Sequence, residues 1–143
     1  MCYCGVCRKT AGCGGYAINV AGEANTLIVS GEDNISVYQA TIQNPEDSSA
    51  QVSSAERRFC KKCGSMLWLY DPRWPQLIHP FASAIDTELP LPPEKTHMML
   101  DFKPSWVQLK DQKESGSTGK HKIFNRYPEE SIADWHNRLG LQY

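Results

Sequence analysis

The first seven residues of the chain, MCYCGVC, contain three cysteines. Cysteines two or three positions apart can direct their sulfur atoms toward one point, and an odd number of thiols leaves one that no disulfide within the stretch can use. Thiolates select soft or borderline metals, of which zinc is the natural choice. Cys2, Cys4 and Cys7 therefore predict a metal-binding turn at the start of the fold.

A second pair, Cys60 and Cys63, lies in the stretch RRFCKKCGSMLW. The glycine after the pair predicts a tight turn in which backbone amides face the two sulfurs, as in a zinc knuckle. A redox dithiol has the same spacing and stays an alternative. We favour the metal interpretation because the apolar run after Cys63 predicts a strand, whereas a helix N-terminus usually lowers the pKa of a redox thiol.

The two motifs together offer five thiol ligands. A closed structural zinc site needs four ligands, while three protein ligands with one exchangeable position are typical of catalytic zinc. Cys13, in the stretch AGCGG, has no partner at ligand spacing, so we expect a small residue packed in a glycine-rich turn. The histidines are scattered and never paired in the sequence, so we expect surface or packing roles for all of them: His79, His97, His121 and His136.

Length and charge limit the classes of protein that the chain can belong to. Its 143 residues match one ordinary domain, so a single domain over residues 1–143 is predicted. A net charge of −1 removes the broad basic surface of a dedicated nucleic-acid binder. The sequence contains neither an apolar run of about 18 residues nor a secretory signal. We therefore expect a cytoplasmic protein, with a nuclear location also compatible, that has no membrane partner.

The pattern of apolar residues and turns predicts a mainly β fold with one helix at the C-terminus. That helix should begin around Pro128, bury Trp135 on its apolar face and end at Gly140. Six prolines between Pro72 and Pro93 exclude a long helix there. We expect a hairpin turn at 31–34, a polar loop from 41 onward and a mobile loop at 110–120. Strands are expected in the run into Cys60 and at 16–22, 26–31, 34–40, 65–70, 97–102 and 105–110.

Two motifs in this order, CYCGVCRKTAG and RRFCKKCGSMLW, resemble the glutathione-dependent formaldehyde-activating enzyme family, which includes centromere protein V relatives. The resemblance extends from Cys2 to about Trp106 and implies a β-tent fold of the Mss4-like type with zinc knuckles. It implies that Cys2, Cys4 and Cys7 hold the zinc that faces the substrate. It also implies that Cys60 and Cys63 hold a structural zinc together with an earlier CxC segment. The sequence lacks that segment, so we expect an N-terminally short member with about one tightly held zinc.

The resemblance implies a zinc-dependent carbon-sulfur lyase or ligase that acts on glutathione-type thiol adducts of formaldehyde or a related electrophile. Arg8 and Lys9, beside the first motif, are the candidate groups that bind the substrate carboxylates, and Arg57 and Arg58 are further candidates. A solvated basic surface is the alternative role for each of these residues. The alternative function is a non-catalytic, zinc-stabilised interaction module. The sequence leaves the oligomeric state open.

Overall fold

The computed structural model describes residues 1–44, 49–109 and 119–141. These residues form two compact units. Unit 1 comprises Met1–Ile18 and Ile85–Tyr143, and unit 2 comprises Asn19–Ala84. The single domain over residues 1–143 stays a prediction. In the described residues, no helix has the length and apolar character that crossing a membrane requires.

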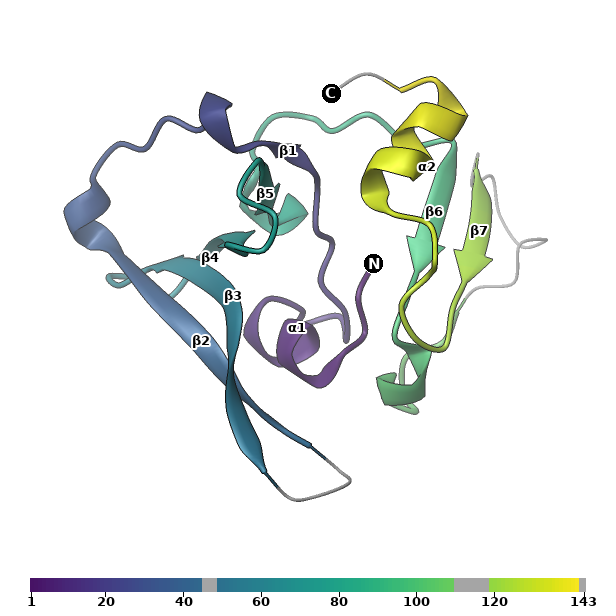
Figure 1. Cartoon of the computed structure of the whole chain (residues 1–143), viewed down its shortest axis with the longest axis horizontal. Coiled ribbons are helices and arrows are strands. Elements are labelled where there is room, and N and C mark those ends of the chain that lie inside the picture. The colour runs from purple at the N-terminus through teal and green to yellow at the C-terminus, as the bar shows by residue number, and fades with distance from the viewer. Residues whose placement is uncertain (45–48, 110–118, 142–143) are drawn as a thin grey trace. The chain divides into compact units, whose positions relative to one another are not determined.

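Unit 2 is built on a five-stranded antiparallel sheet (Figure 1). The strand at one edge of the sheet has two residues, and the strand at the other edge has nine. Buried side chains on this sheet include Ala55, Ile78 and Phe81. The strands follow the spatial order β1 (Gly22–Glu23), β5 (Leu77–Pro80), β4 (Met66–Tyr70), β3 (Ala50–Cys60) and β2 (Ile35–Gln43).

The hairpin of β2 and β3 is longer than the sequence predicts. The expected loop begins later than residue 41, because Thr41 pairs with Val52 and Ile42 pairs with Gln51. Of its described residues, Asn44 and Ser49 lie outside the strands. β-branched side chains favour the pleated conformation, and pairing with a neighbouring strand outweighs the polar composition of the segment. Residues 45–48 of the expected loop lie outside the described part. The strands predicted at 34–40, at 65–70 and in the run into Cys60 are confirmed by β2, β4 and β3.

The strands predicted at 16–22 and 26–31 are largely wrong. The first region makes isolated bridges, Cys2 with Ala17 and Asn19 with Phe81, before the two residues of β1. The second region follows a 3-10 helix, η1 (Ala24–Thr26). The chain turns at 31–34 as the 3-10 helix η2 (Glu32–Asn34), which follows Gly31 at a left-handed φ of 73°. The hairpin predicted there is wrong, because residues 27–30 form no strand that could pair with β2. Unit 2 ends in η3 (Ala82–Ala84).

Unit 1 combines a helix near the N-terminus with a parallel strand pair and the C-terminal helix. The pair consists of β6 (Glu94–His97) and β7 (Lys120–Ile123), which lie side by side in Figure 1. The strand predicted at 97–102 is wrong beyond His97, because the chain turns at Met99 (φ 66°) into a 3-10 helix, η4 (Leu100–Phe102). The strand predicted at 105–110 is absent from 105–109, and residues 110–118 lie outside the described part.

The C-terminal helix α2 (Ile132–Leu139) is confirmed, including its end at Gly140 in the left-handed conformation. Its predicted start is wrong, because Ser131 is the N-cap and its Oγ accepts a hydrogen bond from the Asp134 amide at 3.1 Å. Buried Glu94 of β6 accepts bonds from Trp135 at 3.0 Å and from Arg138 at 2.6 Å. These bonds hold α2 against β6. The mainly β fold with a short C-terminal helix is therefore confirmed.

Candidate metal centre

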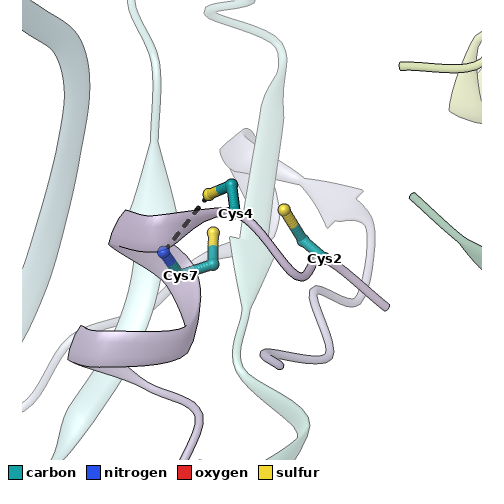
Figure 2. Close-up of side chains that lie close together, drawn as sticks. All are labelled: Cys2, Cys4 and Cys7. Atoms are coloured by element: carbon teal, nitrogen blue, oxygen red, sulfur yellow. Dashed lines mark hydrogen bonds between the residues drawn. The ribbon is translucent and has the colours of Figure 1, made fainter. Parts of the chain in front are cut away.

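Three thiols converge near the N-terminus of unit 1. The sulfur atoms of Cys2, Cys4 and Cys7 all lie within 4.8 Å of one another. Figure 2 shows the three side chains directed toward one another from the N-terminal segment and the first turn of helix α1 (Gly5–Thr10). Tetrahedral zinc with sulfur ligands at about 2.3 Å places them roughly 3.8 Å apart, so this donor set fits zinc. The predicted metal-binding turn therefore has the geometry of a metal centre.

Backbone hydrogen bonds on both sides of the chain fix the position of Cys2. Its amide donates to the Ala17 carbonyl at 2.8 Å, and the Ala17 amide donates back at 3.0 Å. On the other side, the Tyr3 amide donates to the Met98 carbonyl at 3.0 Å, just beyond the end of β6. The first residues therefore act as a strand between two distant parts of the sequence, and Cys2 is buried there.

Cys4 and Cys7 belong to helix α1, which the sequence analysis missed. Cys4 is the N-cap, and its sulfur accepts a hydrogen bond from the Cys7 amide at 3.3 Å (Figure 2). N-caps are usually Ser, Thr, Asp or Asn, so the ordinary signal for a helix start is missing. The three-residue spacing of the cap is also the spacing of a metal knuckle. The same hydrogen bond therefore begins the helix and holds the Cys4 sulfur beside the backbone of Cys7.

Two glycines shape the turn that follows α1. A Cβ atom on Gly12 would lie 2.2 Å from the Tyr16 carbonyl oxygen. Gly15 has a φ of 91°, and a Cβ atom there would lie 2.3 Å from Cγ2 of Val107. Glycine alone fits both positions without strain. The tight turn brings Ala17 back to Cys2 and closes the thiol group.

The three thiols share protons unequally. Hydrogen bonds from the Cys2 and Cys7 side chains lower the pKa of Cys4 well below its ordinary value, and backbone amides add to the effect. The same bonds and burial raise the pKa of Cys2. The low pKa of Cys4 favours its thiolate, which is the form that binds a metal.

Cys60 and Cys63 lie in unit 2, at the turn between β3 and β4. The predicted tight turn of a β-hairpin is confirmed: the Gly64 amide donates to the Cys60 carbonyl at 2.7 Å, and Gly64 has a φ of 77°. Metal binding by this pair stays a prediction. Cys63 is exposed, and a hydrogen bond with Ser65 at 3.2 Å lowers the pKa of its thiol. Within the described residues, the one group of three or more potential ligands is Cys2, Cys4 and Cys7.

The remaining candidates occupy different environments. Cys13 lies in the predicted turn, but its side chain is exposed rather than packed. Arg8 and Lys9 form the last turn of α1, where cations suit the helix dipole. Lys9 is exposed, whereas Arg8 is half-buried and its Nε is a buried donor without a hydrogen-bond partner in the described residues.

In unit 2, Arg57 is buried. Arg58 forms an ion pair with Glu56.

The histidines were expected in surface or packing roles, and the structure places two of them, His97 and His121, in contact with each other. Nε2 of His97 lies 2.9 Å from Nδ1 of His121, and Nδ1 of His97 lies 2.9 Å from the hydroxyl of Tyr3. His97 and His79 are both buried. No local signal indicated the histidine pair, because the register of a parallel strand pair depends on residues 24 positions apart.

The chain is similar to known proteins over most of its length. The family model described as glutathione-dependent formaldehyde-activating enzyme matches residues 1–101. A curated protein of Halomonas elongata, named "Putative glutathione-dependent formaldehyde-activating enzyme", is 52% identical over 141 residues, which cover 99% of this chain and 82% of that protein. The match includes both cysteine motifs. The chain therefore belongs to the family of glutathione-dependent formaldehyde-activating enzymes.

Proposed function

We propose that the protein catalyses the reversible joining of a glutathione-type thiol to formaldehyde at a zinc ion held by Cys2, Cys4 and Cys7. The observation that carries this proposal is the convergence of these three thiols in a member of the family. In the forward direction a carbon-sulfur bond forms between the thiol sulfur and the carbonyl carbon. The carbonyl π electrons move to oxygen, which takes a proton, while the thiol gives one up.

The three cysteines supply charge and leave room for a fourth ligand. Zinc supplies, when bound, a soft Lewis acid that stabilises a thiolate at neutral pH. Three thiolates already place three negative charges beside a dication, so the ion is electron-rich. Such a centre suits a substrate thiolate better than the generation of hydroxide. The donor set therefore supports thiol chemistry as the reaction class.

Arg8 and Lys9 are proposed to bind the carboxylates of the thiol substrate. Both follow Cys7 directly, and the buried Nε of Arg8 has unused capacity to donate. A guanidinium can donate two parallel hydrogen bonds to a carboxylate, which fixes orientation as well as charge. A thiol without carboxylates should therefore bind less tightly than glutathione.

For the second motif we propose a minor role in tight metal binding. Cys60 and Cys63 contribute two thiols at an exposed turn. Metal affinity depends on a full ligand set, so a pair of thiols holds zinc weakly. We accordingly expect about one tightly held zinc per chain, at Cys2, Cys4 and Cys7.

The test is release of formaldehyde from S-hydroxymethylglutathione, followed by a formaldehyde-specific dye in rapid mixing. The zinc-loaded protein should increase the rate over the spontaneous reaction, and chelation with verified metal removal should abolish the increase. Cys13→Ser is the matched control for Cys7→Ser and should keep the activity. A rate equal to the spontaneous one in zinc-loaded protein would reject catalysis and favour the interaction module.

A further inference from the structure

Tyr3, which lies between Cys2 and Cys4 in the sequence, is the first of three side chains that are connected by hydrogen bonds. The hydroxyl of Tyr3 and Nδ1 of His97 are 2.9 Å apart, and Nε2 of His97 and Nδ1 of His121 are also 2.9 Å apart. The rings are stacked as well: the Tyr3–His97 centroids are 5.9 Å apart and the His97–His121 centroids 5.0 Å. Tyr3, at 1% exposure, and His97, at 6%, are buried, whereas His121 is half-buried.

Tyr3 connects this chain to the metal centre. It is the residue between Cys2 and Cys4, so a rotation of its backbone moves both sulfurs. Its amide is bonded to the Met98 carbonyl and its side chain to His97, the residue before Met98. Two consecutive residues of one segment therefore hold the backbone and the side chain of Tyr3.

Packing alone does not explain this arrangement. A phenylalanine at position 3 would fill the same volume without a buried hydroxyl, which costs free energy unless it is bonded. Burial lowers the pKa of His97 to about 4, so its imidazole is neutral at pH 7. A neutral imidazole has one donor and one acceptor nitrogen. The nitrogen of His97 that faces Tyr3 therefore determines whether the other nitrogen donates to His121 or accepts from it. Such a network fixes ring orientations that apolar contacts leave loose.

We propose that Tyr3, His97 and His121 form a positioning network that holds the Cys2–Cys4 segment in the geometry that binds metal. This inference rests on the proposed metal site and adds residues that do not touch the metal. Outer residues that hydrogen-bond to metal ligands typically contribute about 10–100-fold in metal affinity. The network acts instead through the backbone that Tyr3 shares with Cys2 and Cys4, and it reduces the freedom of these ligands before the metal binds.

The experiment compares Tyr3→Phe with Tyr16→Phe. Both changes remove one phenol hydroxyl from neighbouring rings, whose centroids are 5.1 Å apart, but only Tyr3 belongs to the network. Zinc affinity is measured by competition with a chromophoric chelator. The absorption bands of the Co²⁺-substituted protein report the coordination geometry. Circular dichroism and a thermal melt check that each variant is folded.

We expect Tyr3→Phe to weaken zinc binding about 10-fold or more and to shift the Co²⁺ bands. His121→Gln, at the half-buried end of the network, should act in the same direction with a smaller effect, and Tyr16→Phe should match the wild type. Folded Tyr3→Phe and His121→Gln proteins with wild-type zinc affinity and Co²⁺ spectra would overturn the inference. A wild-type protein that binds no zinc tightly would instead reject the proposed metal site.

Discussion

Cys4 and Cys7 have the same spacing as Cys60 and Cys63, yet the structure uses the two pairs differently. The first pair lies at the start of helix α1, and its sulfurs lie close to that of Cys2. Cys2 belongs to a strand-like segment just before the helix. The second pair lies in the turn of the hairpin that β3 and β4 form, and Cys63 is exposed. A CxxC spacing therefore fixes the distance between two sulfurs, while a metal centre also needs a third ligand and burial.

The backbone hydrogen bonds around the two cysteine pairs also differ. Around Cys2, backbone bonds to Ala17 and Met98 join three parts of unit 1 that are distant in the sequence. Around Cys60, the bonds to Ser65 and Gly64 are local to the turn, and the Lys61 amide donates to the Asn34 carbonyl at 2.8 Å beside β2. We infer that metal binding at the first pair stabilises contacts with two distant segments, whereas the second pair lies in a hairpin that its own sheet already holds.

The largest expected effect comes from removing one thiol of the converging group. Cys7→Ser should weaken zinc binding by about 100-fold or more, because a full ligand set contributes roughly 10–16 kcal/mol in small zinc domains and each ligand holds a share of it. Cys13→Ser, at an exposed turn position, should leave the affinity unchanged. Competition with a chromophoric chelator measures both. Equal losses in the two variants would contradict the assignment.

A smaller effect is expected from the turn that closes the first site. Gly15→Ala introduces a side chain at a φ of 91° and within 2.3 Å of Val107, so it should destabilise the protein by about 1–3 kcal/mol. Gly14→Ala is the matched control, because the nearest atom to its Cβ, Cε1 of Tyr16, lies 3.9 Å away. Urea unfolding of both variants measures the difference. Similar midpoints would show that the turn is not constrained as described.

Changes at the hairpin pair should act on stability rather than on tight metal binding. Cys60→Ala should keep the tightly bound zinc, with an affinity within a few-fold of the wild type, and should lower the melting temperature by a few degrees. Metal analysis after gel filtration and a thermal melt provide the two readouts. Loss of the tight zinc would instead indicate that Cys60 shares a site with the N-terminal thiols.

The smallest effect concerns the acid stability of unit 1 away from both pairs. Hydrogen bonds from Arg138 lower the pKa of Glu130 from 4.5 to about 2. Because the folded pKa is the lower one, its contribution is complete above pH 4.5 and is lost as the pH falls toward 2. Metal-free Glu130→Gln protein should therefore show a weaker decline of melting temperature over this interval than the wild type. The exposed neighbour Glu129 provides the control, and an unchanged decline in Glu130→Gln would contradict the expectation.

The sequence predicted the parts of the site that local spacing determines. These are the three N-terminal thiols, the hairpin at Cys60 and Cys63, and the end of α2 at Gly140. Each depends on residues within a few positions of one another, where turn and cap chemistry decide the conformation.

The rest depends on contacts between distant residues. The parallel pairing of β6 with β7 brings His97 close to His121. No periodic pattern in either segment predicts this pairing. Helix α1 was missed because a cysteine takes the place of an ordinary N-cap. The strands expected at 16–22 and 26–31 have β-favouring residues but find few partners, so propensity alone overestimated them.

The metal centre is tested most directly by a Co²⁺ titration of the Cys60→Ser/Cys63→Ser double variant, with and without glutathione. We predict thiolate-to-cobalt charge-transfer absorption that saturates at one Co²⁺ per chain, because Cys2, Cys4 and Cys7 remain. We also predict that glutathione raises this absorption, as a fourth thiolate joins the ion, and that a thiol-free analogue of glutathione does not. Loss of the band in the double variant, or no response to glutathione, would contradict the claim that the three converging thiols form a thiol-binding metal centre.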